Sequence, residues 1–188
     1  MLAYLNRGII LKGQGNIERA LSDFDKAIEL SPNYAPAYTS RGNAWRDKSN
    51  LDQAITDYDK AIQVDPRYVP AYNMRGVTWR AKGNPDRALT NYDMAIRIDP
   101  GYAPAYNNRG NVWRDKGDLD RALADYDKAI EINPNDLSTY ANRSVAWKVK
   151  GNFERAQADY DKAVEVGLRN TSDAAKRGAI TNHNRSLD

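Results

Sequence analysis

Hydrophobic and polar positions along this chain repeat with a period of 34 residues. Within each period, apolar and aromatic residues recur at helical spacing over two segments, and a short polar break separates the segments. Tyrosine marks the same place five times, at Tyr4, Tyr38, Tyr72, Tyr106 and Tyr140. A period of this length indicates a stacked array of small helical units and not one globular core. The sequence therefore predicts five repeats, at 1–34, 35–68, 69–102, 103–136 and 137–168.

Each repeat is expected to hold two helices, over its positions 2–14 and 17–31, where position 1 is the first residue of the repeat. Glycine or serine at position 15 is followed by Asn or Asp, which is typical of a helix end followed by an N-cap. Proline at position 32 closes the second helix in the first four repeats, because proline cannot continue a helix. The predicted fold class is all-α, an array of antiparallel helix pairs.

The first helix of each repeat has two distinct sides. Since a helix turns by about 100° per residue, positions 4, 7, 8 and 11 share one side, and positions 2, 5, 6, 9, 12 and 13 share the other. The first side carries the aromatic residues and a glycine at position 8, which allows close approach of two backbones. We expect this side to pack against positions 20, 24, 27 and 28 of the second helix. The recurrent aromatic rings are therefore predicted to be core.

An arginine stands at position 7 of every repeat, on the side that is predicted to be buried. A buried guanidinium requires carboxylate or carbonyl partners. We therefore predict a structural ladder that pairs these arginines with the Asp residues at position 23, with Asn91 giving Arg75 the weakest partner. The arginines are Arg7, Arg41, Arg75, Arg109 and Arg143, and the acids are Asp23, Asp57, Asp125 and Asp159. A second acidic set, at position 25, is expected to point away from the buried stripe: Asp25, Asp59, Asp93, Asp127 and Asp161.

These offsets resemble those of the tetratricopeptide repeat family. The second repeat reads Tyr38, Gly42, Trp45, Ala54, Tyr58, Ala61 and Pro66, and the third and fourth keep the same residue types. The first repeat departs with Leu11 and Phe24, and the fifth with Ser144 and Leu168. The resemblance implies a right-handed superhelical solenoid of five repeats that binds other proteins along its concave groove.

The segment 169–188 keeps Arg177 and Gly178 in phase with the repeats but lacks their aromatic residues. It has Ala174 where tyrosine stands elsewhere, and Thr181 where tryptophan stands. We expect it to form a separate C-terminal solvating helix on the fifth repeat, with a frayed end over 182–188.

In the family that this chain resembles, the second side of the first helix lines the groove. Position 12 is always basic here, and positions 5, 6 and 9 are rich in asparagine. Asparagine both donates and accepts hydrogen bonds, and arginine holds carboxylates, so this side suits an extended polar or acidic peptide. The alternative is that these residues only solvate an exposed face. The candidate peptide-binding residues are Asn43, Arg46, Asn73, Arg80, Asn107, Asn108, Asn111, Arg114, Asn142 and Lys148.

Two binding modes of the family can be compared with this chain. The carboxylate clamp of its chaperone-tail adaptors would fall on Asn107, Asn111, Asn142, Ser172 and Lys176, where both lysines of the clamp are absent. The asparagine ladder of the O-GlcNAc transferase repeats is matched at Asn6, Asn108 and Asn142 and broken at Ser40 and Met74. A chaperone-tail receptor is not expected, and the ladder is matched only in part.

Composition and charge bear on three other classes of function: nucleic-acid binding, membrane association and catalysis. The net charge of +3 comes from 28 basic and 25 acidic residues that are interleaved, which makes nucleic acid an unlikely partner and gives no support to a membrane role. Cysteine is absent and His183 is the single histidine, and the sequence shows no metal-ligand cluster, no phosphate loop and no nucleophile paired with a base. We expect neither enzymatic activity nor a cofactor.

Self-assembly is the alternative function. The first helix is unusually apolar, with Leu5, Ile9, Ile10 and Leu11, and exposed ends of a repeat array can stack on one another. Because Met1 already lies inside the first repeat, we also expect the chain to be a fragment of a longer protein.

Overall fold

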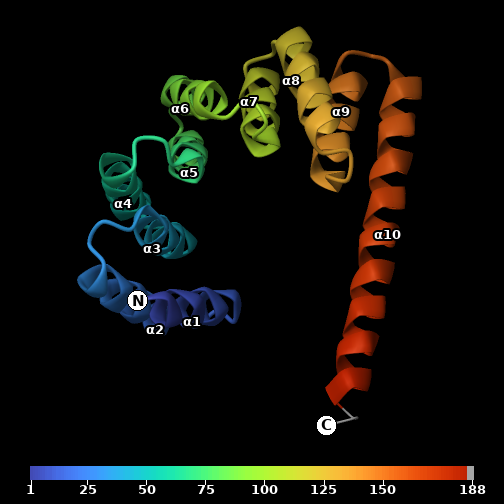
Figure 1. Cartoon of the computed structure of the whole chain (residues 1–188). Coiled ribbons are helices and arrows are strands. Elements are labelled where there is room, and N and C mark those ends of the chain that lie inside the picture. The colour runs from blue at the N-terminus through green and yellow to red at the C-terminus, as the bar shows by residue number, and fades with distance from the viewer. Residues whose placement is uncertain (186–188) are drawn as a thin grey trace. The chain divides into compact units, whose positions relative to one another are not determined.

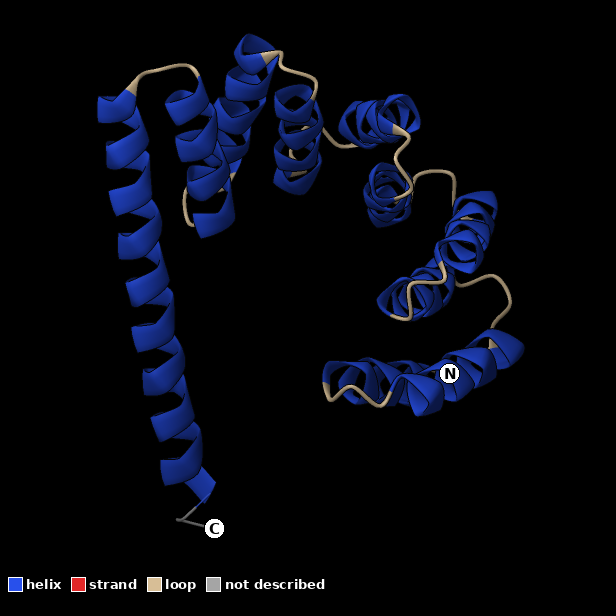
Figure 2. Ribbon diagram, turned by 180° about the vertical axis from the view of Figure 1, so that it is seen from behind, coloured by secondary structure: helices blue, strands red, loops and turns tan. Residues whose placement is uncertain are grey.

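The computed structural model of this chain describes the backbone of residues 1–185 and the side chains of residues 1–171. These residues form helices joined by short loops, with no strand among them (Figure 2). The prediction of an all-α fold is confirmed. The helices are α1 (Leu2–Gly13), α2 (Ile17–Leu30), α3 (Ala35–Asp47), α4 (Leu51–Val64), α5 (Val69–Ala81), α6 (Pro85–Ile98), α7 (Ala103–Asp115), α8 (Leu119–Ile132), α9 (Leu137–Val149) and α10 (Phe153–Arg185).

The chain divides into two compact units, Met1–Val112 and a second that begins at Trp113, so that the boundary falls within α7. In the first unit, α1 packs on α2, α3 on α4 and α5 on α6, and each pair contacts the next through α2 with α3 and α4 with α5. Figure 1 shows α3 and α5 on the inner layer of this unit and α4 and α6 on its outer layer. In the second unit, α9 packs on both α8 and α10.

The breaks within repeats follow from residues 15 and 16 of each repeat. Gly15, Gly83, Gly117 and Gly151 have φ between 75° and 85°, and Ser49 takes the same left-handed conformation at 62°. The next residue caps the second helix in four repeats, since the side chains of Asn50, Asn84, Asp118 and Asn152 each accept a hydrogen bond from a backbone N–H three residues later. Asn16 makes no such bond, so the cap expected there is not formed.

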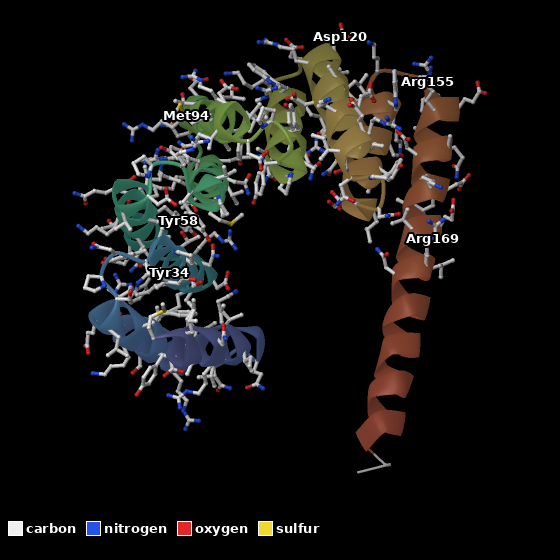
Figure 3. All side chains as sticks on the ribbon, in the orientation of Figure 1. Tyr34, Tyr58, Met94, Asp120, Arg155 and Arg169 are labelled. Atoms are coloured by element: carbon white, nitrogen blue, oxygen red, sulfur yellow. The ribbon has the colours of Figure 1, made fainter. Side chains whose placement is uncertain are left out.

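The core of each repeat is an aromatic ring set against a glycine. A Cβ added to Gly42 would lie 2.7 Å from the ring of Tyr58, and one added to Gly76 would lie 2.6 Å from the ring of Tyr92. Both rings are buried, as expected, and Tyr58 lies between α3 and α4 (Figure 3). In the fifth repeat, Ser144 replaces the glycine, and the ring of Tyr160 is 57% exposed. In earlier repeats this ring is also covered by the first helix of the next repeat, as Phe24 is by Ala44.

The C-terminal segment differs from the prediction. Helix α10 runs without a break from Phe153 to Arg185, so a separate helix does not begin at Arg169 (Figure 1). The physical reason is Leu168, which stands where four repeats have a helix-ending proline and allows the helix to continue. Residues 186–188 of the expected frayed end, and the side-chain contacts expected of 172–188, lie outside the described residues.

Candidate protein-binding face

The arginine at position 7 joins the two helices of its own repeat and also joins that repeat to the one before it. Arg41 of α3 donates from Nε and Nη2 to the two carboxylate oxygens of Asp57, at 2.9 and 2.6 Å. Its third nitrogen, Nη1, donates to Asp25 of the preceding repeat at 2.7 Å. Arg143 repeats this geometry in the second unit, with Asp159 and Asp127. Each of these guanidinium groups therefore binds two carboxylates, one in its own repeat and one in the repeat before it.

The predicted ladder is confirmed for Arg7 with Asp23, Arg41 with Asp57 and Arg143 with Asp159. Arg75 makes one hydrogen bond to Asn91, at 2.6 Å, in place of two. The acids at position 25 lie away from the buried stripe, as expected, with side chains that are 51–60% exposed, but they also belong to the ladder. They face the following repeat and accept hydrogen bonds from its arginine, in the pairs Asp25–Arg41, Asp59–Arg75, Asp93–Arg109 and Asp127–Arg143.

The ladder also sets the ionisation of its members. Hydrogen bonds from Arg7 hold the pKa of Asp23 below its usual value. Asp57 is 2% exposed, and its burial raises its pKa, against the opposing effect of the Arg41 hydrogen bonds. Hydrogen bonding to Asp57 raises the pKa of Arg41, so the guanidinium remains charged. The charge of Arg41 is held by the two carboxylates that it contacts, so this arginine serves the structure.

The arginine at position 12 of the second repeat has weaker partners. Arg46 of α3 donates from Nη1 to the sulfur of Met74, at 3.4 Å, and its Nη2 lies 3.5 Å from Asp47. A thioether is a weak acceptor, so this contact satisfies little of the guanidinium's hydrogen-bonding capacity. Lys12 of α1, in contrast, makes a 2.9 Å salt bridge with Asp47. Arg46 therefore retains more hydrogen-bonding capacity for an anion than Lys12 does.

The asparagines of this layer are largely engaged with neighbouring helices. Asn43 accepts a hydrogen bond from the hydroxyl of Tyr58 at 2.9 Å, and burial raises the pKa of that hydroxyl to about 12. Asn73 is 1% exposed, and its Oδ1 accepts from Nδ2 of Asn108 at 3.0 Å. Asn111 is also buried. Position 5 faces the adjacent first helix. Asn73 is therefore not open to a ligand on this face, which differs from the sequence prediction.

The candidate residues fall in both units. The first unit carries Asn43, Arg46, Asn73, Arg80, Asn107, Asn108 and Asn111, among which Arg80 is exposed and Asn107 and Asn108 are half-buried. The second unit carries Arg114, Asn142 and Lys148. Arg114 donates to Asp115 at 3.1 Å, and Lys148 is exposed. The inner layer of the first unit thus presents the larger candidate face.

Sequence reasoning did not foresee the partners that fill this face. The hydroxyl of Tyr58 reaches Asn43 in the same repeat, and the sulfur of Met74 reaches Arg46 of the preceding one. A signal existed in the spacing, because a tyrosine at position 24 lies one helix away from an amide at position 9. The contact of Met74 with Arg46 depends on how adjacent repeats stack, which periodicity alone does not give.

Within the part of the chain that the structure describes, no group of three or more acidic, histidine or cysteine side chains is arranged to hold a metal ion. Among the same residues, no helix is both long and apolar enough to cross a membrane.

Consecutive helix pairs with this arginine ladder and ring-on-glycine core define a helical-repeat protein. The tetratricopeptide repeat model matches residues 2–34, 35–68 and 103–136, which is more than half of the chain. The chain belongs to the tetratricopeptide repeat family. It is therefore a scaffold of a family that is typically non-enzymatic and acts in protein–protein interaction.

Solved structures of this fold are similar over most of the chain. TTC0263 of Thermus thermophilus, described as a thermophilic TPR protein, is 22% identical, with 95% of this chain and 97% of that chain covered at a TM-score of 0.78. PilF of Pseudomonas aeruginosa is 20% identical, with coverage of 96% and 86% and a TM-score of 0.79. YrrB, described as a TPR protein with an unusual peptide-binding site, is 28% identical, with coverage of 87% and 84% and a TM-score of 0.62. No curated protein matches the chain at a significant level.

Proposed function

We propose that the chain binds an extended polar or acidic peptide segment on the inner layer of its first unit. The observation that carries this proposal is the state of Arg46, a guanidinium whose contacts are a thioether sulfur and a carboxylate 3.5 Å away. Arginine binds carboxylates with two parallel hydrogen bonds, and such charge-assisted bonds are about twice as strong as neutral ones. An acidic side chain of a partner would offer Arg46 a stronger acceptor than Met74 does.

The surrounding residues favour an extended segment over a compact ligand. Arg80 of α5 occupies the same position as Arg46, one repeat further on, and is exposed. Asn108 of α7 is half-buried on the same layer. Extended peptides bind helical-repeat scaffolds when charged and amide groups recur along their length. The second unit carries the corresponding residues Arg114, Asn142 and Lys148.

Likeness to YrrB supports a peptide ligand only in general terms. That protein is described as having an unusual peptide-binding site, and its fold covers most of this chain. The choice of a polar or acidic peptide rests on the side chains of this chain.

The test is a peptide array of acidic, neutral and basic decamers, probed with the native chain and with an Arg46→Glu plus Arg80→Glu variant. We expect acidic and polar peptides to bind the native chain. The variant should lose at least about tenfold in affinity for them, since a hydrogen bond to a charged group contributes about 1.5–3 kcal/mol. Fluorescence anisotropy on the best peptides gives the dissociation constants.

The matched control is Arg67→Glu plus Arg97→Glu. It changes the charge equally at two exposed residues outside the first helices. We expect it to bind as the native chain does, apart from a small salt-screened effect. Absence of binding, or equal losses in the two double variants, would reject the proposed face.

A further inference from the structure

The outer side of α1 carries the same stripe that elsewhere joins one repeat to the next. The stripe consists of positions 3, 7, 10 and 14, which share one side of the helix. At positions 3 and 10 its members in the later repeats are 0–1% exposed: Ala37, Ala44, Ala71, Thr78, Ala105, Val112, Thr139 and Ala146. In α1 the four members are Ala3, Arg7, Ile10 and Gln14, and all are exposed. Ile10 is 60% exposed.

The charge of this stripe is also incompletely paired. The side chain of Arg7 is 64% exposed, whereas those of Arg41, Arg75, Arg109 and Arg143 are 21–23% exposed. Each of the later arginines donates to an Asp at position 25 of the repeat before it. Arg7 instead pairs with Asp23 of its own repeat. Nη1 of Arg7 thus lacks the type of acceptor that its counterparts have.

Two internal junctions show what such a stripe packs against. In the first unit, Ala44 belongs to one cluster with Leu21 and Phe24 of the preceding repeat. In the second unit, Ala146 belongs to one cluster with Leu123 and Tyr126. Position 10 therefore packs against positions 21 and 24 of the repeat before it. Lys48 and Glu18 add a salt bridge of 2.6 Å at the first of these junctions, between positions 14 and 18.

The corresponding surface of the fifth repeat is open and apolar. Tyr160 at position 24 is 57% exposed and Val164 at position 28 is 45% exposed. Beside them lies a surface pocket of about 430 Å³, lined by Ser144, Val145, Lys148, Phe153, Ala156, Gln157 and Tyr160. At the internal junctions this surface is covered by position 10 of the next repeat, as Ala44 covers Phe24 and Ala146 covers Tyr126.

We propose that α1 of a second copy of this chain docks on α9 and α10, in the register of an internal junction. Ile10 of the second copy would enter the pocket beside Gln157 and Tyr160, which offers space for a side chain larger than the Ala, Thr or Val of the later repeats. Arg7 of the second copy would donate to Asp161, the position-25 acid of the fifth repeat. Asp161 accepts from Gln157 through Oδ1 at 2.8 Å, which leaves its other oxygen for the arginine.

This contact joins two different surfaces, so a dimer still presents one unoccupied surface of each kind. Further copies can therefore add to it, and the size of the assembly increases with concentration. Sedimentation of the native chain should therefore give a mass that rises above 21.2 kDa as the concentration increases. Ile10→Glu and Tyr160→Glu each place a charge on one of the two surfaces. Each variant alone should remain a monomer, and both should keep the native helical circular dichroism, because both residues are exposed.

The decisive sample is an equimolar mixture of the two variants. Ile10→Glu retains the α9–α10 surface and Tyr160→Glu retains the α1 surface, so the mixture should form a dimer and nothing larger. Leu30→Glu is the matched control, with a residue that is 53% exposed on α2 and outside both surfaces, and it should associate as the native chain does. A native chain that is monomeric at all concentrations would overturn the proposal. So would association that survives Tyr160→Glu but not Ile10→Glu, which would indicate symmetric pairing of α1 with α1.

Discussion

Glycine at position 8 sets how closely the two helices of a repeat approach. At Gly8 the ring of Phe24 lies where a Cβ would be, at 2.5 Å, and the same holds for Gly42 and Gly76 with their tyrosines. Real Cβ atoms do not lie this close to other atoms, so a side chain at these glycines would force the ring to move.

Gly76→Ala should therefore destabilise the protein. The added methyl would lie 2.6 Å from the ring of Tyr92, which is 1% exposed, and such overpacking costs about 1–3 kcal/mol. Urea unfolding measures the change. Gly13→Ala is the control, because its Cβ would meet nothing within 4 Å, and it should be neutral or stabilise by up to about 1 kcal/mol. Equal losses for the two variants would contradict the role of the ring contact.

A second residue-scale prediction concerns alkaline pH. Burial raises the pKa of Tyr58 to about 12, with Arg46 opposing the shift. In the unfolded chain the tyrosine releases its proton near pH 10. The stability that the buried, neutral hydroxyl contributes is therefore fully present below about pH 10 and is lost as the pH rises towards 12. Over that interval the free energy of unfolding should fall by about 1.4 kcal/mol per pH unit for this group.

Urea unfolding of the native chain and of Tyr58→Phe, at several values between pH 9 and 12, isolates this effect. Lysines titrate in the same range in both proteins, so the difference between the two curves reports Tyr58. The variant should show the shallower fall, and identical pH dependences would argue that the hydroxyl is not buried as the structure has it.

At the scale of helices, the arginine ladder defines each junction. One arginine reaches two even-numbered helices, its own partner and that of the preceding repeat, so the pairing of helices and the stacking of repeats are coupled. Replacing Arg41 should therefore disturb a pair and a junction together.

Arg41→Ala should cost about 3 kcal/mol or more, since it leaves the 2% exposed Asp57 without its ionic partner. Arg7→Ala should cost less, because Arg7 is 64% exposed and pairs with one carboxylate. Thermal or urea unfolding of the two variants gives the comparison. The reverse order of stabilities would show that the junction carboxylate contributes little.

At the scale of the whole molecule, stability arises from neighbour-to-neighbour contacts within each of two compact units. The two proposals concern different surfaces of these units. Peptide binding uses the inner layer of the first unit, and association uses α1 together with α9 and α10. Arg46→Glu and Ile10→Glu therefore separate the two activities, because each change leaves the other surface intact.

The sequence by itself determined the helices, the repeat boundaries between them and the core rings, because these follow from helical periodicity and from glycine and proline at fixed positions. It also determined the partners within a repeat, such as Arg41 with Asp57, since both lie on faces that one helix pair brings together. Only the tertiary structure decided the junctions. Stacking turned Asp25 towards Arg41 and buried Asn73 against Asn108. These contacts depend on how one repeat packs against the next. The sequence period shows that the repeats are alike, but it does not fix the angle between adjacent repeats.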